Sequence, residues 1–76
     1  MDPSEIIKLL RSTPFQPFEM RLHDGRTFPV RHPELVLVTR RSIILAWHNN
    51  GSHGLADDWT VISPVAIASL HPVIQR

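Results

Sequence analysis

The 76-residue sequence contains no cysteine, and this absence removes several kinds of chemistry at once. Disulfide bridges, zinc–thiolate sites and a cysteine nucleophile are all excluded. Apolar residues make up 42% of the chain, but no run of them approaches the roughly 20 residues that a membrane-spanning helix needs. An excess of one charge is also missing, since eight Lys and Arg stand against seven Asp and Glu. The charge balance alone therefore does not indicate a polyanionic partner.

Glycine is scarce, and its three copies are dispersed at Gly25, Gly51 and Gly54, so the sequence has no glycine-rich phosphate loop. None of the serines lies in a Gly-x-Ser-x-Gly nucleophile elbow. A chain of this length buries only about 60% of its extended surface, which leaves little room for a water-excluded pocket. We therefore expect a single domain over residues 1–76 that has no enzymatic activity and no cofactor.

What is present begins with the pattern of a short helix over about residues 3–12. Asp2 can cap its first turn, and Ile6, Leu9 and Leu10 fall on one face at helical spacing. A helix this short is marginal by itself, so its apolar face has to dock on another element.

The next segment predicts a β-hairpin made from residues 18–22 and 26–31. The first strand alternates strictly between apolar and polar residues, and an Asp-Gly pair signals the turn. A three-residue loop pairs Met20 with Phe28 and collects the apolar side chains on one face, whereas a two-residue loop divides them between both faces. We expect the three-residue loop, with Gly25 in a left-handed conformation.

Further strands are expected at residues 35–38, 43–47, 59–62 and within 66–73. The first two of these do not alternate, which indicates that both of their faces are covered. One cover is the core, and the other is either the helix or a second subunit. Counting outward from a loop centred on His53 places Trp47 and Trp59 opposite each other, as a packed cross-strand pair.

Five histidines in a short chain raise the question of a metal site. His48 and His53 flank the glycine-containing loop and Asp57 follows it, so two imidazoles and a carboxylate could surround a metal ion. The spacing matches no stringent metal motif, and a polar, solvated loop is the favoured interpretation. A metal-dependent enzyme at these residues is the weakest of the functions considered.

A nucleic-acid interface is the stronger alternative. Arg26, Arg31, Arg40 and Arg41 cluster near predicted turns, where they could contact phosphates. Acidic residues beside these turns dilute the positive field, and the two tryptophans are better explained by packing than by base stacking. An RNA- or DNA-binding module that uses these four arginines therefore remains the second hypothesis.

Three segments carry a resemblance to known proteins: Thr-Pro-Phe-Gln-Pro-Phe at residues 13–18, Leu-x-Asp-Gly-Arg at 22–26 and Val-x-His-Pro-Glu at 30–34. They are similar to the recurring elements of a group of small bacterial proteins of about this length, a group without an assigned function. The order of elements also resembles an Sm-like small β-barrel. This resemblance implies a mainly β fold, in which an N-terminal helix precedes a five-stranded antiparallel open barrel.

Sm-like proteins form rings that bind single-stranded RNA through two loops. The corresponding stretches here, residues 32–35 and 62–65, lack the asparagine and the Arg-Gly pair of that family, so the resemblance does not carry over an RNA site. What it does imply is assembly through strand edges. We therefore expect a cytoplasmic, non-catalytic binding or assembly module that forms a homo-oligomer or binds another protein, without a membrane partner.

Overall fold

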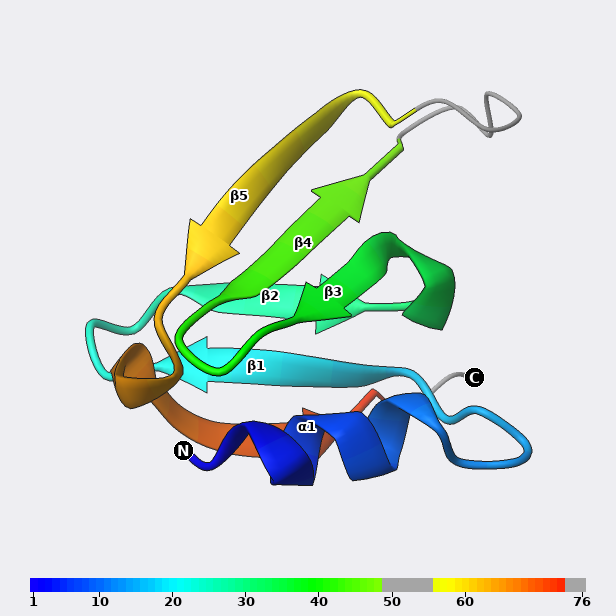
Figure 1. Cartoon of the computed structure of the whole chain (residues 1–76), viewed down its shortest axis with the longest axis horizontal. Helices are drawn as coiled ribbons and strands as arrows, with labels where there is room; N and C mark the ends of the chain where they lie inside the picture. Colours follow the sequence, from blue (N-terminus) through cyan, green and yellow to red (C-terminus); the bar gives the residue numbers. More distant parts are fainter. Residues whose placement is uncertain (49–55, 74–76) are drawn as a thin grey trace.

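The computed structural model describes residues 1–48 and 56–73. The elements follow in the order α1 (Pro3–Leu10), β1 (Phe18–Leu22), β2 (Thr27–Val30), the short 3-10 turn η1 (Pro33–Leu35), β3 (Val36–Val38), β4 (Ile43–Trp47), β5 (Asp58–Ile62), the 3-10 turn η2 (Pro64–Ala66) and β6 (Ile67–Pro72). The strands form two antiparallel sheets, in the orders β2-β1-β6 and β3-β4-β5 (Figure 1). The protein is thus a small, mainly β domain with an N-terminal helix.

The expected five-stranded barrel differs from this arrangement in strand number and in closure. The described residues contain six strands, and their two sheets are not closed into a barrel. The sequence pattern already indicated residues 26–31 and 35–38 as separate segments, and η1 separates β2 from β3 at His32-Pro33, so the count of five applies only if these two are treated as one strand. Proline lacks the backbone N–H that a continuous strand pair would use, so the chain leaves one sheet before it enters the other.

Helix α1 is two residues shorter than the predicted segment and is capped as expected. The Asp2 side chain accepts a hydrogen bond of 2.9 Å from the backbone N–H of Ser4. Ile6 is completely buried, so the apolar helix face does dock on the core. Among the described residues, no helix is both long and apolar enough to cross a membrane.

The hairpin between β1 and β2 has the register that the sequence predicts. Met20 pairs with Phe28 across the two strands. The backbone N–H of Leu22 donates to the carbonyl of Arg26 at 2.8 Å, which leaves a three-residue turn. Gly25 in that turn has a φ of +93°, as a left-handed turn residue requires. The prediction of the longer turn is confirmed.

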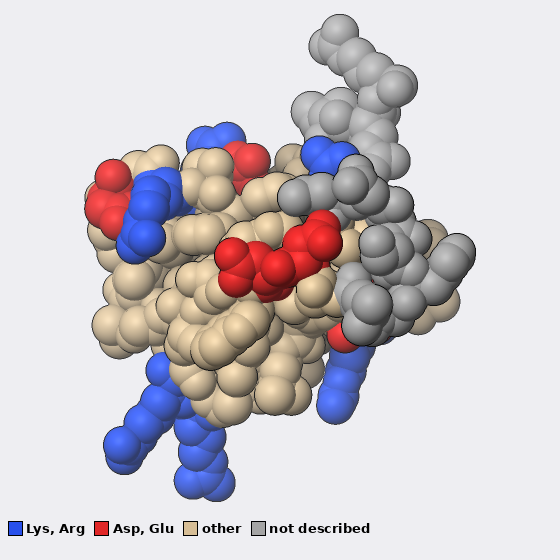
Figure 2. Space-filling model, turned by 90° about the horizontal axis from the view of Figure 1, so that it is seen from above, with Lys and Arg blue, Asp and Glu red and all other residues tan. Residues whose placement is uncertain are grey.

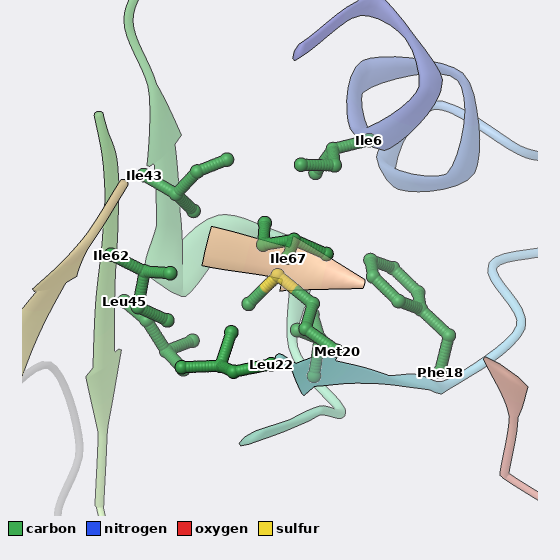
Figure 3. Packing of buried hydrophobic residues seen from close by; sticks show 9 residues of the cluster. Ile6, Phe18, Met20, Leu22, Ile43, Leu45, Ile62 and Ile67 are labelled. Carbon is green, nitrogen blue, oxygen red and sulfur yellow. The ribbon is translucent and has the colours of Figure 1, made fainter. Parts of the chain in front are cut away.

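The core lies between the two sheets and consists of side chains from both of them and from α1. Its buried members are Ile6, Phe18, Met20, Leu22, Val30, Ile43, Leu45, Ile62 and Ile67. Figure 3 shows Ile6 pointing from the helix toward the buried side chains of both sheets. The helix therefore covers the space between the sheets and completes the core.

The expected pairing of Trp47 with Trp59 is wrong. The register of β4 and β5 places Trp59 opposite Ala46 and Trp47 opposite Asp58. This register differs by one residue from the symmetric count, and a one-residue shift moves a side chain to the other face of the sheet. Trp47 consequently packs against the core, while Trp59 is 63% exposed on the opposite face.

Candidate functional site

The outer face of sheet β3-β4-β5 carries apolar side chains on all three strands. Ile43 and Ile62 are buried and face the core, so the residues next to them on each strand face outward. The outward-facing positions, which we call the assembly face, are Leu37, Ile44, Ala46, Trp59 and Val61. None of these side chains is charged or polar.

The assembly face is continuous across the three strands. Leu37 pairs with Ile44, which in turn pairs with Val61 on the far side. Leu37, Trp59 and Val61 are 60%, 63% and 52% exposed. Adjacent exposed apolar residues of this kind are typical of interaction surfaces, whereas isolated ones are ordinary. The helix packs against the core, on the other side of this sheet.

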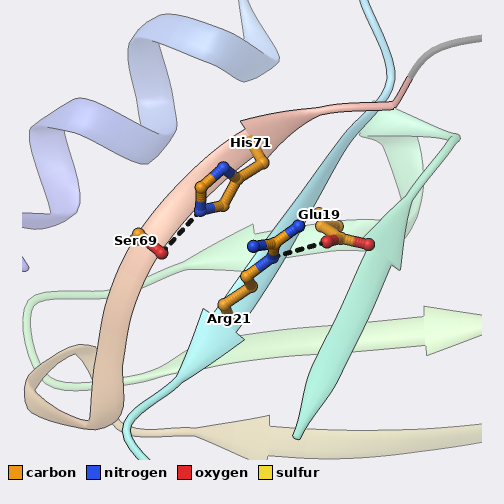
Figure 4. Close-up of polar contacts among 4 residues, drawn as sticks. All are labelled: Glu19, Arg21, Ser69 and His71. Carbon is orange, nitrogen blue, oxygen red and sulfur yellow. Dashed lines mark hydrogen bonds and ion pairs between the residues drawn. The ribbon is translucent and has the colours of Figure 1, made fainter. Parts of the chain in front are cut away.

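The outer face of the other sheet has the opposite character. Glu19 lies opposite His71 and Arg21 opposite Ser69 on the neighbouring strands β1 and β6 (Figure 4). The Nε atom of Arg21 is 2.7 Å from Oε1 of Glu19, and Oγ of Ser69 is 2.7 Å from Nε2 of His71. Polar outer residues are normal for an antiparallel sheet with one face in water.

The Ser69–His71 hydrogen bond has the length of a nucleophile–base pair, although no motif in the sequence pointed to it. Its signal was the i, i+2 spacing of the two residues on one strand. A catalytic pair also needs a group that orients the base and a cavity for the substrate. Glu19 forms its ion pair with Arg21 instead, and neither Ser69 nor His71 lines the groove between β2 and β4 or the groove between α1 and the end of β3. The arrangement fits a solvated sheet surface.

A groove of about 480 Å³ lies where the two sheets diverge, between β2 with η1 on one side and β4 on the other. Its lining includes Phe28, Arg31, His32, Leu45, Trp47 and His48. Leu45 is buried and forms the floor, while Phe28 and Trp47 are half-buried. This groove brings together Arg31 and His48, which their places in the sequence suggested for different functions.

The four arginines proposed for nucleic-acid binding come from three separate segments. Arg26 is in the β1–β2 turn, where its Nε lies 2.7 Å from Oδ2 of Asp24. Arg31 lines the groove described above, and Arg40 and Arg41 are in the β3–β4 turn. In the view of Figure 2, the basic side chains lie in separate groups around the outline, with acidic side chains near the middle. The described residues visible in this view form no continuous basic patch.

The residues proposed for a metal site are only partly described. His53 lies outside the described residues, and the backbone N–H of Asp57 donates to the carbonyl of Trp47 at 2.8 Å. The ring of His48 instead lies beside that of His32, with centroids 5.1 Å apart. Within residues 1–48 and 56–73, no group of three or more His, Asp or Glu side chains could hold a metal ion.

Comparisons of the chain with protein-family models, with curated proteins and with solved structures give no match. A proposal about function therefore has to come from the geometry of the chain itself.

Proposed function

We propose that this protein is a non-catalytic assembly module that binds further copies of itself through the assembly face. The observation that carries the proposal is the difference between the two sheets. The outer face of sheet β2-β1-β6 carries polar, hydrogen-bonded side chains, which is typical of a face in water. The outer face of sheet β3-β4-β5 exposes Leu37, Trp59 and Val61 next to the apolar residues of β4. Removing such apolar surface from water stabilises an interface by about 25 cal/mol per Å².

The size of the assembly face indicates how copies would join. A stable interface buries about 800 Å² on each partner, about a seventh of this chain's 5586 Å² surface. Three strands span only about 10 Å between the outer strand axes and about 17 Å along a five-residue strand. The face alone is therefore smaller than a stable interface. The edge of β5, which has no strand partner beyond β4 among the described residues, supplies the remainder by strand pairing.

The charge of the chain supports a second copy as the partner. The formal net charge is only +1, so two copies experience little long-range repulsion. No ionisable side chain belongs to the assembly face, so placing two such faces together buries no like charges. An apolar face with these properties is complementary to itself.

We further propose that the fold is a five-stranded Sm-like open barrel in which β2 and β3 act as one bent strand interrupted by η1. The strand orders support this proposal, because β6-β1-β2 followed by β3-β4-β5 gives the succession of a single curved sheet if β2 and β3 are joined. The resemblance to Sm-like proteins also implies assembly through strand edges, in agreement with a role for the edge of β5.

Substitution of one residue in the assembly face tests the proposal. Val61→Lys places a charge in the face at an exposed position, where it does not disturb the core. Thr27→Lys is the matched control, because Thr27 is an exposed strand residue on the polar sheet. We expect light scattering to show an oligomer for the wild type and for Thr27→Lys, and a monomer for Val61→Lys. Equal masses for both variants would contradict the proposal.

A further inference from the structure

The groove between β2 with η1 and β4 shares Ala46 with the assembly face, contains none of its exposed residues Leu37, Trp59 and Val61, and has the features of a small-molecule site. Its volume of about 480 Å³ is within the range of about 300–1,000 Å³ found for ligand sites. Leu45 forms an apolar floor and is 4% exposed. Phe28 and Trp47 add two aromatic rings to the lining, one from each sheet. Such a lining suits a planar apolar group.

The ionisable residues of the lining are basic or can become so. Among the described residues, they are Arg31, His32 and His48, and none of the described lining residues carries a carboxylate. His32 has a carboxylate beside it in Glu34, whose Oε1 is 3.6 Å from Nδ1 of His32 and which does not line the groove. An anion in the groove would therefore meet one guanidinium and two imidazoles, and it would compete with Glu34 for His32.

One ring–ring contact and one cation–ring contact involve residues of the lining. The imidazoles of His32 and His48 lie with centroids 5.1 Å apart and planes inclined by 32°, so η1 and the end of β4 present them together. The guanidinium of Arg26, which is ion-paired with Asp24, lies 5.9 Å from the centroid of the Phe28 ring. The aromatic and basic parts of the groove thus lie side by side.

From this juxtaposition we propose that the groove binds a small planar aromatic anion. Its ring lies over Leu45 against Phe28 and Trp47, and its carboxylate or phosphate group faces Arg31 and the two histidines. This site does not depend on self-association, because none of its aromatic or basic groups belongs to the assembly face.

Nuclear magnetic resonance of the ¹⁵N-labelled full chain provides the test, because the chain has two tryptophans in different places. Trp47 lines the groove and Trp59 is on the outer face of the sheet, so the indole N–H signal of Trp59 is an internal control. Trp59→Phe assigns the two signals. The probes are 1-naphthoate and adenosine monophosphate, which carry a carboxylate and a phosphate, with adenosine and inorganic phosphate as the separate halves of the second probe.

We expect at least one of the two anionic aromatic probes to shift the Trp47 signal saturably in the millimolar range or below, while the Trp59 signal stays in place. The probe that binds identifies the anionic group that the groove prefers. If adenosine monophosphate is that probe, adenosine and phosphate alone should each bind at least about fivefold more weakly, since each lacks one half of the recognition.

Three substitutions at exposed positions test how charged side chains contribute to binding, without disturbing the core. Arg31→Gln should weaken binding at least about fivefold by removing the guanidinium, and Glu34→Gln should strengthen it up to about threefold by removing the competing carboxylate. Arg41→Gln is the control, because Arg41 lies in the β3–β4 turn outside the groove, and it should leave binding unchanged.

Three results would overturn the proposal. The first is the lack of a saturable Trp47 shift with both anionic aromatic probes. The second is equal weakening by Arg31→Gln and Arg41→Gln, which would indicate general charge attraction. The third is binding of a single-stranded oligouridylate by a chain that binds neither small probe, which would assign the groove to nucleic acid instead.

Discussion

Gly25 is the residue whose backbone conformation decides the shape of the β1–β2 hairpin. Its φ of +93° lies in the region that L side chains rarely adopt, and an added Cβ would meet no atom within 4 Å. We therefore expect Gly25→Ala to destabilise the fold by about 1–2 kcal/mol through the backbone alone. Urea unfolding followed by circular dichroism measures this loss. Gly25→Asn should lose less stability, because asparagine tolerates positive φ. Equal stability of Gly25→Ala and wild type would contradict a positive φ at this position.

Asp24 in the same turn makes stability depend on pH. The pKa of its carboxyl is lowered, chiefly because the backbone N–H of Arg26 donates to it and also through the Arg26 guanidinium. A lowered pKa in the folded state gives stability that is present above the unfolded pKa of about 3.8 and is lost as pH falls through the folded pKa. Asp24→Asn should therefore be less stable than wild type at pH 7, with the difference closing below about pH 4.

Urea midpoints of the two proteins over the range from neutral to acidic pH measure this difference. Asparagine keeps an oxygen that can accept from the backbone N–H of Arg26, so the comparison isolates the charge of the carboxylate. A difference between Asp24→Asn and wild type that stays constant down to the lowest pH would contradict the assignment.

The residues of this turn could be predicted from the sequence because all of their determinants are local. An Asp-Gly pair follows an alternating strand, and a single choice of loop length puts Met20 and Phe28 on one face.

The position of Trp59, in contrast, could not be predicted from local sequence. Its face depends on the register of β5 against β4, and these strands are separated by a long connection without a turn signal that fixes the count. The symmetric count therefore put Trp59 on the wrong side of the sheet.

At the scale of elements, α1 depends on one buried side chain. Ile6 is the buried residue of the helix, and it contacts the core between the two sheets. We expect Ile6→Ala to lose about 2–4 kcal/mol, since it leaves a cavity as well as less apolar contact. A chain of this size has a total stability of roughly 4–11 kcal/mol, so Ile6→Val, with an expected loss of about 0.5–1.5 kcal/mol, serves as a milder second variant.

Urea unfolding followed by far-ultraviolet circular dichroism measures both losses. Lys8→Ala is the control, because Lys8 is exposed on the same helix and its loss should stay within about 0.5 kcal/mol. If Ile6→Ala and Lys8→Ala unfold alike, the helix does not complete the core.

The elements themselves could be largely predicted, and their arrangement only in part. Helical spacing and alternation located α1 and the first hairpin within two residues of their observed bounds. The division between β2 and β3 was visible as His32-Pro33-Glu34, but whether a proline bends one strand or separates two depends on the packing of both sheets. That information is non-local, and the sequence pattern does not contain it.

At the scale of the whole molecule, the candidate sites show the same limit. Arg31 and His48 were each proposed from local features, one for phosphate contacts and the other for a metal ion. They meet in one groove because the two sheets diverge there, and no spacing in the sequence indicates this. The assembly face was closer to prediction, since strands without alternation at residues 35–38 and 43–47 indicated a cover on each side. In the structure the core covers one side of these strands, and the other side is the exposed assembly face.

Size-exclusion chromatography with light scattering on the untagged chain, over a range of concentrations and with absorbance at 260 and 280 nm, tests the central claim most directly. Self-association through the apolar assembly face predicts a mass above that of the monomer, an ordinary protein spectrum and an oligomer that persists in high salt, because screening acts on charges and not on apolar contacts. A monomer at every concentration, or an oligomer that exists only with excess absorbance at 260 nm and dissociates in salt, would contradict the claim.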